Sequence, residues 1–487
     1  MEHLDLIMKN AGRAFETFRY TSGDIRKTLL YYIAEALESD SAAIISAACT
    51  ETNLPEVRFS GELARTCMQL RMFGDIAAEG SWVEAVIDTA EEDRKPLRRP
   101  DIRKMLIPCG PVLVFGASNF PLAYSTPGGD TASALAAGCP VVVKMHPAHP
   151  VTARLCRDAI SRAIEKCALP PSVFQLVEEA GFEAGKYLVQ HPLTAGVGFT
   201  GSLAGGRAIY DYAQQRDNPV PVFSEMGSVN PVILMNDALT TKGSDIARTL
   251  GASILMGVGQ FCTNPGILIG ISGKSLDEFM QMLAGEISRI PSYKMLHRGI
   301  YENYHKSMDI ALGQKGVDVI YEHSEKEDMK APAVLARVNG KAFLENPRLR
   351  EEVFGPFSLF VCCDHQEELE KVWSSFEGQL TTTIFGTDQD LRDNQALIRD
   401  CAGFAGRIVF NGAPTGVEVA HATVHGGPYP ATTDGRVTSV GADAIKRWVR
   451  PVCWQDCPDF LLPDALKSDN PLNLWRKINT SFSKEKI

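Results

Sequence analysis

The stretch Gly110-Pro111-Val112-Leu113-Val114-Phe115-Gly116 is a continuous apolar run enclosed by glycines. Runs of this kind are typical of strands that are buried on both faces, as in a parallel sheet. Similar short runs recur at 141–144, 173–177 and 196–201, and a helical pattern follows each of them, at about 151–167, 182–191 and 203–215. This alternation predicts an α/β fold in which a parallel sheet carries helices on its faces.

A second series of alternating elements begins beyond residue 225. Strand patterns occur at 231–234, 266–270, 357–361 and 407–411, with a helix near 243–257, whereas residues 1–90 read mostly as helix. A chain of 487 residues is too long for a single hydrophobic core. We therefore expect two α/β domains that meet near residue 225.

The composition is that of an ordinary soluble globular protein, with 45% hydrophobic and 22% charged residues. A net charge of −10 without a long basic run argues against nucleic acid as the main partner. The N-terminus has no apolar signal core, and no apolar run approaches the length that spans a membrane. The twelve cysteines form no C-x-x-C, and the pair His421 and His425 lacks a metalloprotease pattern. We predict a cytoplasmic protein with reduced thiols and no metal site.

One cysteine stands out because its neighbours are polar residues and turn formers. It is Cys262, in the stretch Gly259-Gln260-Phe261-Cys262-Thr263-Asn264-Pro265-Gly266. Most cysteines are buried and inert, so a packing role is the alternative. A free thiol with a pKa of about 8.5 is only slightly ionised at neutral pH, so a catalytic cysteine needs help from its surroundings.

Three further motifs lie where predicted strands end. The glycine turn at 199–206 leads from a strand into a helix and could aim backbone N–H groups at a phosphate, although a plain strand-to-helix turn is equally compatible. Asn119 follows the strand at 110–116, where its amide could either donate into a cleft or form a turn. Glu225 ends another apolar strand, so it is either a general base in apolar surroundings or a solvated loop residue.

Together these motifs resemble the aldehyde dehydrogenase family. The shared segments, in the order that the family has them, are S-N-F-P at 118–121, V-V-K at 142–144, F-T-G-S at 199–202, E-M-G at 225–227, G-Q-F-C at 259–262 and E-E-V-F-G-P at 351–356. Within the family, the stretches 259–266, 411–419 and 425–434 are most similar to α-ketoglutarate semialdehyde (2,5-dioxopentanoate) dehydrogenases and to bacterial fatty aldehyde dehydrogenases. The family's usual E-L-G-G is E-M-G-S here, with Ser228 in place of the second glycine.

The resemblance implies a role for each matching residue. Cys262 would be the nucleophile, Asn119 the amide that holds the oxyanion, and Glu225 the general base. The positions implied for the nicotinamide cofactor are Lys144 at the ribose hydroxyls, Gly201 and Ser202 at the phosphates, Glu352 at the second ribose and Phe354 near the nicotinamide. The reaction would oxidise an aldehyde to a carboxylic acid through a thiohemiacetal and a thioester.

Cofactor preference and substrate rest on departures from the family pattern. The common K-P-x-E is Lys144-Met145-His146-Pro147 here, so the acid that favours NAD is missing. Arg207 could pair with a 2′-phosphate, or it is an ordinary surface arginine. We expect NADP to be used at least as well as NAD. For the substrate, we expect α-ketoglutarate semialdehyde, with Arg436 at its far end or in a structural salt bridge. The residues expected along the channel are Phe120, Phe261 and Leu122, which suit aliphatic aldehydes too.

The resemblance also implies an organisation and an assembly. A cofactor-binding domain would cover 1–224, with part of 412–446 returning to it, and a catalytic domain would cover 225–411. The strand at 101–108 would pair with 447–454 in a bridging element, and 447–487 would form the bridging strand and tail. Exposed strand edges of this kind favour a homodimer or homotetramer.

Three alternatives to this activity remain open. A medium- or long-chain fatty aldehyde is the alternative substrate. A non-redox thiol acyltransferase or esterase could use Cys262 and Glu225, but Lys144, Ser202 and Glu352 would then have no purpose. A non-catalytic scaffold would have no need to retain Cys262, Glu225 and Asn119 together.

Overall fold

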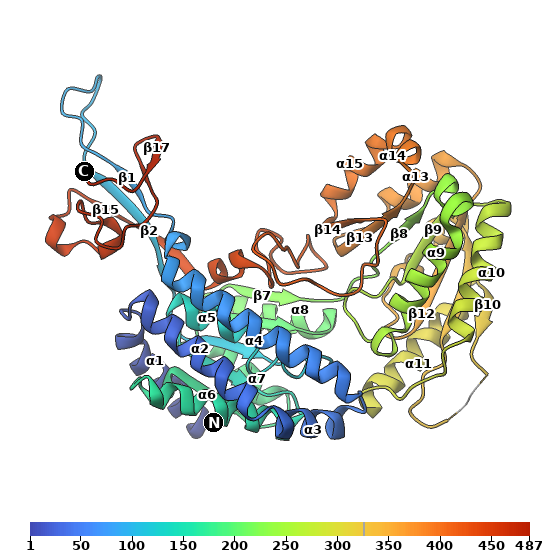
Figure 1. The fold of residues 1–487 in the computed structure, drawn as a ribbon, viewed down its shortest axis with the longest axis horizontal. Coiled ribbons are helices and arrows are strands. Elements are labelled where there is room, and N and C mark those ends of the chain that lie inside the picture. The colour runs from blue at the N-terminus through green and yellow to red at the C-terminus, as the bar shows by residue number, and fades with distance from the viewer. Residues whose placement is uncertain (325–326) are drawn as a thin grey trace.

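The computed structural model describes residues 1–324 and 327–487, and within them the strands form three sheets (Figure 1). The first sheet has the order β5-β4-β3-β6-β7, and all its neighbouring strands are parallel. Its strands are β3 (Val112–Phe115), β4 (Val141–Lys144), β5 (Phe174–Val177), β6 (Gly196–Thr200) and β7 (Val222–Glu225). The apolar runs in the sequence correspond to these strands, and the predicted α/β fold is confirmed.

Helices cover both faces of this sheet because successive side chains of each strand point to opposite sides. Val112 and Val114 pack in a core with residues from 29–37 and 63–77, whereas Leu113 packs in a separate core on the other face with residues from 4–11. The connecting helices are α5 (Gly129–Ala137), α6 (Pro150–Lys166), α7 (Phe182–Gln190) and α8 (Leu203–Gln214). The N-terminal helices are α1 (Glu2–Phe18), α2 (Gly23–Ser39), α3 (Ser41–Thr52) and α4 (Glu56–Glu79).

The second sheet has seven strands in the order β10-β11-β12-β9-β8-β13-β14, and only the edge strand β10 pairs antiparallel among the described residues. These strands are β8 (Val232–Leu234), β9 (Ile267–Ile271), β10 (Asp318–Glu322), β11 (Val334–Asn339), β12 (Phe357–Cys363), β13 (Gln379–Phe385) and β14 (Ala405–Phe410). The accompanying helices are α9 (Asn236–Leu255), α10 (Lys274–Ser288), α11 (Arg298–Leu312), α12 (Gly340–Glu345), α13 (Gln366–Ser374), α14 (Asp388–Asp393) and α15 (Gln395–Asp400). This sheet lies on the right in Figure 1, opposite the N-terminal helices.

The third sheet projects from the body of the molecule, at the upper left of Figure 1. Its order is β15-β2-β1-β16-β17, with β1 (Val86–Asp88), β2 (Ile102–Pro108), β15 (Val449–Gln455), β16 (Arg476–Ile478) and β17 (Ser481–Ser483). β2 pairs antiparallel with β15 along its whole length, as the sequence predicts. The strands β1, β16 and β17 were not predicted, because each is only three residues long.

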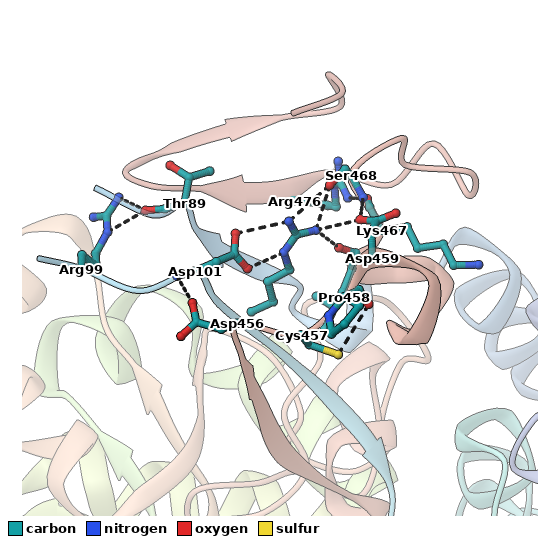
Figure 2. Close-up of polar contacts among 12 residues, drawn as sticks. Thr89, Arg99, Asp101, Asp456, Cys457, Pro458, Asp459, Lys467, Ser468 and Arg476 are labelled. Carbon is teal, nitrogen blue, oxygen red and sulfur yellow. Dashed lines mark hydrogen bonds and ion pairs between the residues drawn. The ribbon is translucent and has the colours of Figure 1, made fainter. Parts of the chain in front are cut away.

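Polar contacts hold the C-terminal tail on this projecting sheet. Figure 2 shows the side chain of Arg99 donating to the carbonyl oxygen of Thr89, and the backbone N–H of Asp101 donating to Asp456 at 3.1 Å. The buried Arg103 pairs with Asp101 at 2.8 Å and donates to the carbonyl of Leu466 at 2.7 Å. The tail is therefore held on the sheet by charged groups that mostly have hydrogen-bond or ion-pair partners.

A search of the helices in residues 1–324 and 327–487 for a membrane span found none that is both long and apolar enough.

Candidate active site

The loop that carries Cys262 has an unusual backbone. It begins in a short 3-10 turn at Met256–Gly259, in which Gly257, Val258 and Gly259 have φ values of 55°, 60° and 66°. A β-branched residue such as Val258 rarely adopts this left-handed conformation. Gly259 lies against backbone, because a β-carbon there would be 2.2 Å from the carbonyl carbon of Gly355. The loop therefore packs directly on the segment that follows Glu352.

A buried hydrogen-bond network holds the cysteine loop in place. The side-chain amide of Asn230 donates to the carbonyl oxygens of Cys262 and Asn264, each at 2.9 Å. The hydroxyl of Ser228 lies 3.0 Å from Oδ1 of Asn230 and 2.9 Å from Oε1 of Gln379. Ser228, where the sequence departs from the family pattern, thus supports the residue that fixes the loop.

The structure brings Cys262 and Glu225 together with a third residue, His425. Nε2 of His425 lies 3.5 Å from Sγ of Cys262 and 2.8 Å from Oε1 of Glu225. The side chain of His425 is fully buried, and that of Glu225 is 4% exposed. The hydroxyl of Ser439 donates to Oε2 of Glu225 at 2.8 Å. The thiol of Cys262, the imidazole of His425 and the carboxylate of Glu225 are therefore close enough to pass a proton between them.

The surroundings raise the pKa of the thiol and lower the pKa of the carboxylate. Burial, and then the charge of Glu225, raises the pKa of the Cys262 thiol well above its ordinary value. Burial acts to raise the pKa of Glu225 too, but the contacts with His425, Ser439 and Cys262 outweigh it and leave that pKa below its usual value. At neutral pH the pair is a protonated thiol beside an ionised carboxylate, which is the state in which a base can activate a nucleophile.

Sequence reasoning missed His425 and Ser439. Both lie in the segment after β14, which runs back along the end of β7, where Thr432 bridges to Glu225 and Met226 donates to the carbonyl of Ala431. In the sequence, His425 matched no metal-binding pattern and was given no other role. The available signal was its position in the stretch 425–434, which the resemblance had already singled out.

The same three side chains also form a set of donors that could hold a metal ion. Sulfur, nitrogen and carboxylate oxygen of Cys262, His425 and Glu225 all lie within 4.8 Å of one another. Zinc is commonly bound by these three ligand types. A zinc ion held by these atoms would occupy the sulfur, so zinc binding and the nucleophilic role predicted for Cys262 exclude each other.

Asn119 lies beside the cysteine loop. Its side-chain amide nitrogen donates to the carbonyl oxygen of Gln260 at 3.0 Å. Because an amide nitrogen carries two hydrogens, a second N–H remains for another acceptor. The contact orients the amide next to Cys262, and its role toward an oxyanion stays a prediction.

The predicted cofactor residues of the first half gather at the carboxyl edge of the first sheet. Lys144 ends β4, where it is half-buried and makes no ion pair with any described residue, and burial lowers its pKa. Ser202 caps α8 by accepting from the N–H of Gly205 at 3.2 Å. A β-carbon on Gly201 would lie 2.6 Å from the ring of Phe199, so this turn needs glycine. A cation without an ion-pair partner beside a helix N-terminus fits a dinucleotide phosphate and ribose.

Glu352 and Phe354 lie on the other side of the cysteine loop. Both line a small cavity that Gly259, Phe261 and Ser228 also border. Burial raises the pKa of Glu352 to about 8, and a backbone contact at Ser228 offsets only part of this effect. A half-buried carboxyl group with so few hydrogen-bond donors around it fits a ligand that brings hydroxyl groups, as a ribose would.

Two residues predicted near the substrate, Arg436 and Leu122, lie elsewhere, whereas Arg207 lies on the helix that follows the glycine turn. Arg436 is 89% exposed, pairs with Asp434 at 2.7 Å and does not line the cavity at Cys262, so its position does not support a substrate role. Leu122 is fully buried in the core under the N-terminal helices and does not line the channel. Arg207 is half-exposed on α8 and pairs with Asp211 at 3.0 Å.

Phe120 and Phe261 do line the cavity that opens at Cys262. Their rings meet edge to face with centres 5.2 Å apart. The cavity measures about 340 Å³, and its wall includes Arg58 and Arg65 of α4. Neither arginine was singled out in the sequence, because they lie about two hundred residues before Cys262 in a helix without a motif.

Comparisons with known proteins agree with this geometry. The family model described as "Aldehyde dehydrogenase family" matches residues 1–428. An alpha-ketoglutaric semialdehyde dehydrogenase of Acinetobacter baylyi is 43% identical over 98% of this chain and 91% of its own length. A second protein of that name, from Azospirillum brasilense, is 44% identical over 95% of this chain and 88% of its own length. A glyceraldehyde-3-phosphate dehydrogenase structure from Methanocaldococcus jannaschii, in complex with NADP, superposes with a TM-score of 0.79 at 18% identity, covering 93% of this chain and 94% of that one.

Proposed function

The chain belongs to the aldehyde dehydrogenase family, and we propose that it oxidises α-ketoglutarate semialdehyde to α-ketoglutarate with NADP or NAD. It is an NAD(P)-dependent oxidoreductase that acts on aldehydes. The observation that carries the proposed chemistry is the thiol of Cys262, at a cavity, within reach of the ionised Glu225 and of His425. The substrate follows from the two relatives that share more than two fifths of their residues with this chain.

The first step is attack by sulfur on the aldehyde carbon. The S–H bond of Cys262 breaks and its proton passes to the Glu225–His425 pair, while a C–S bond forms and the carbonyl oxygen becomes an oxyanion. The free N–H of Asn119 and the backbone N–H of Cys262 would hold that oxyanion. One donor of this kind contributes about 10²–10³ in rate.

Oxidation and hydrolysis follow from the same constellation. Lys144, Ser202 and Glu352 would hold the cofactor, and the oxidised nicotinamide, when bound, supplies a hydride acceptor for the former aldehyde carbon, which becomes a thioester. The Glu225–His425 pair releases the thiol proton to solvent, so that Glu225 can take a proton from water as the hydroxide adds to the thioester. The C–S bond then breaks, and the leaving sulfur takes the proton from Glu225. Sulfur is released for the next turnover, and the net change consumes aldehyde, water and NAD(P)⁺ and yields the carboxylate, NAD(P)H and two protons.

We propose that NADP is used at least as well as NAD. Position 147 is Pro147, so no carboxylate there repels a 2′-phosphate, and Arg207 near the start of α8 could exchange Asp211 for that phosphate. Comparing kcat/KM for the two cofactors tests this. A large advantage for NAD would defeat it.

The activity is tested with a panel of aldehydes, following NAD(P)H by absorbance. We expect α-ketoglutarate semialdehyde to be the best substrate among succinate semialdehyde and medium-chain aldehydes, and Cys262→Ala to lose activity by more than about 10⁴-fold. Highest kcat/KM with medium-chain aldehydes would favour the fatty aldehyde alternative. Ester hydrolysis without NAD(P)H formation from any aldehyde would favour a thiol esterase, whose cysteine, histidine and acid are also present here.

The domain bounds, assembly and location are also proposals. We assign cofactor binding to 1–224 with part of 412–446, catalysis to 225–411, and bridging to 101–108 and 447–487. β15 is an edge strand of the projecting sheet, which favours pairing with a second copy in a homodimer or homotetramer. All twelve cysteines are free, which supports the reducing cytoplasm. Light scattering during gel filtration tests the assembly, and a monomer would overturn it.

A further inference from the structure

The cavity at Cys262 has charged side chains in its wall. Its lining comes from α4, from the loop after β3, from the cysteine loop and from Gly416 and Val417 after β14. Along α4, the side chains that face it are Val57, Arg58, Glu62 and Arg65, together with the backbone of Gly61. The cavity thus has two guanidinium groups and a single carboxylate in its wall, which leaves an excess of positive charge.

The carboxylate is already saturated, and it compensates only one of the arginines. Oε1 of Glu62 accepts from the backbone N–H groups of Leu122 and Ala123, each at 2.9 Å, and Oε2 pairs with Arg58 at 2.6 Å. Arg65 forms no ion pair within the described residues. Its Nη2 donates to the hydroxyl of Tyr124 at 3.2 Å.

Buried N–H donors on both arginines lack an acceptor. Nη1 of Arg65 and Nε of Arg58 are shielded from solvent and have no hydrogen-bond partner in the described part of the chain. Buried polar groups of this kind are normally paired, and leaving a charged one unpaired is costly. Arg65, which lines the cavity and has no counter-charge among the described residues, is therefore the group that a ligand with negatively charged oxygen would compensate, with a small turn of the guanidinium bringing its unpaired donor to that oxygen.

Aromatic rings hold the two guanidinium groups in position. The guanidinium of Arg58 lies over the ring of Phe120, 4.3 Å from its centre, and that of Arg65 lies 5.2 Å from the ring centre of Tyr124. The ring of Tyr124 is in turn 6.1 Å from the ring of His425, which contacts Cys262. One tyrosine and one histidine side chain therefore connect Arg65 to the sulfur of Cys262, a separation suited to a short substrate chain.

We propose that Arg65, assisted by Arg58, binds a carboxylate at the far end of the substrate, so that the enzyme selects short aldehydes that carry an acid group. This inference rests on the proposed aldehyde oxidation and deepens it. The carboxylate would accept the free N–H donors and neutralise Arg65, while the aromatic wall contacts the carbon chain between acid and aldehyde. A neutral alkyl chain would leave the same donors buried and unpaired.

The test compares two substrates in matched variants. In Arg65→Met, we expect the ratio of kcat/KM for α-ketoglutarate semialdehyde over pentanal to fall about 10–150-fold, as expected for losing hydrogen bonds to a charged group. Arg65→Lys, which keeps the charge without the planar fork, should recover part of the ratio. The control is Arg71→Met on the same helix, because Arg71 pairs with Glu38 on α2 outside the cavity and should leave the ratio unchanged.

Product binding supplies a second readout. α-Ketoglutarate carries the same acid end, so its inhibition constant should rise in Arg65→Met and not in Arg71→Met. Melting temperatures of all variants show whether the fold is retained.

The outcomes separate this inference from the proposed function. Suppose that wild type oxidises α-ketoglutarate semialdehyde and that Arg65→Met leaves the ratio unchanged, whether kcat/KM for both substrates stays the same or falls equally. The inference is then overturned and the proposed function stands. If wild type rejects that substrate but oxidises another carboxylated aldehyde in an Arg65-dependent manner, the proposed substrate is overturned and the inference stands. A wild-type preference for pentanal over every carboxylated aldehyde overturns the inference.

Discussion

Two buried carboxylates, Glu62 in the wall of the cavity that opens at Cys262 and Glu225 beside the cysteine itself, differ in what surrounds them. Glu62 accepts from two backbone N–H groups and from Arg58, all of which are fixed donors that keep their protons. Glu225 contacts a serine hydroxyl, an imidazole and a thiol, and the last two belong to side-chain types that transfer protons or act as nucleophiles in catalysis. A buried carboxylate surrounded by fixed donors is a structural anchor, whereas one beside titratable groups can move protons.

The difference explains why burial alone is a poor guide to catalysis. Glu62 holds the backbone at Leu122 and Ala123, just after Asn119 and Phe120, so it shapes the site without touching a reacting atom. Glu225 is equally inaccessible, but its partners include the sulfur. The predictions below test this contrast, beginning with the largest effect.

Glu225→Gln should lower kcat by about 10²–10⁴-fold, because the amide cannot accept a proton from the thiol or from water. Stopped-flow measurement should show NAD(P)H formation slowed and hydrolysis stalled. Glu62→Gln should keep kcat within a few-fold. Equal losses of kcat in the two variants would contradict the distinction between Glu225 as a proton-transferring group and Glu62 as a structural anchor.

The pH dependence of thiol alkylation should shift when Glu225 loses its charge. The negative charge of Glu225 helps to raise the pKa of Cys262, so Glu225→Gln should lower that pKa and extend alkylation by iodoacetamide to lower pH. Glu62→Gln should leave the profile in place, because Glu62 is not in contact with the sulfur. Alkylation rates measured from about pH 5 to 10 check both variants, and an unchanged profile in Glu225→Gln would show that Glu225 does not set the proton affinity of the sulfur.

The free energy of unfolding should fall more in Glu62→Gln than in Glu225→Gln, which is the reverse of the order expected for kcat. Glu62→Gln keeps the oxygen that accepts from Leu122 and Ala123, but it removes the counter-charge of Arg58 and turns an NH₂ group toward that guanidinium, which should cost roughly 1–3 kcal/mol in the free energy of unfolding. Arg58 is partly exposed, so the cost should stay below that of breaking a fully buried pair. Urea denaturation of both variants measures this. A larger loss in Glu225→Gln would mean that Glu225 is the anchor.

The smallest effect is expected at Arg436. Its side chain is almost fully exposed and pairs only with Asp434 in the described structure, so Arg436→Ala should change kcat/KM for α-ketoglutarate semialdehyde by less than about twofold. Steady-state kinetics with this substrate check it. A tenfold rise in KM would restore the role that the sequence suggested.

The sequence was informative where the physical signal is local. Apolar runs such as 110–116 predicted the parallel sheet, because a strand buried on both faces needs apolar residues throughout. Cys262, Glu225 and Asn119 were found because each lies in a distinctive turn or at the end of a strand. The structure brings these three residues to one place.

Contacts between distant segments could not be predicted in this way. His425 reaches Cys262 only because the chain after β14 returns to β7, a pairing that no local pattern encodes. Arg65 faces the same cavity from a helix about two hundred residues upstream. Arg436 was chosen for its charge, and charge alone does not indicate whether a side chain faces a cavity or solvent.

The contact of Gly259 with the backbone of Gly355 places the sulfur loop and the Glu352 segment in register without an intervening side chain. No rotamer can adjust to absorb a displacement there, since each segment meets the other through its main chain. Protein engineers who remodel 351–356 to accept a different dinucleotide should therefore expect the reactivity of the sulfur to change with it, and recovering activity will require altering both segments together.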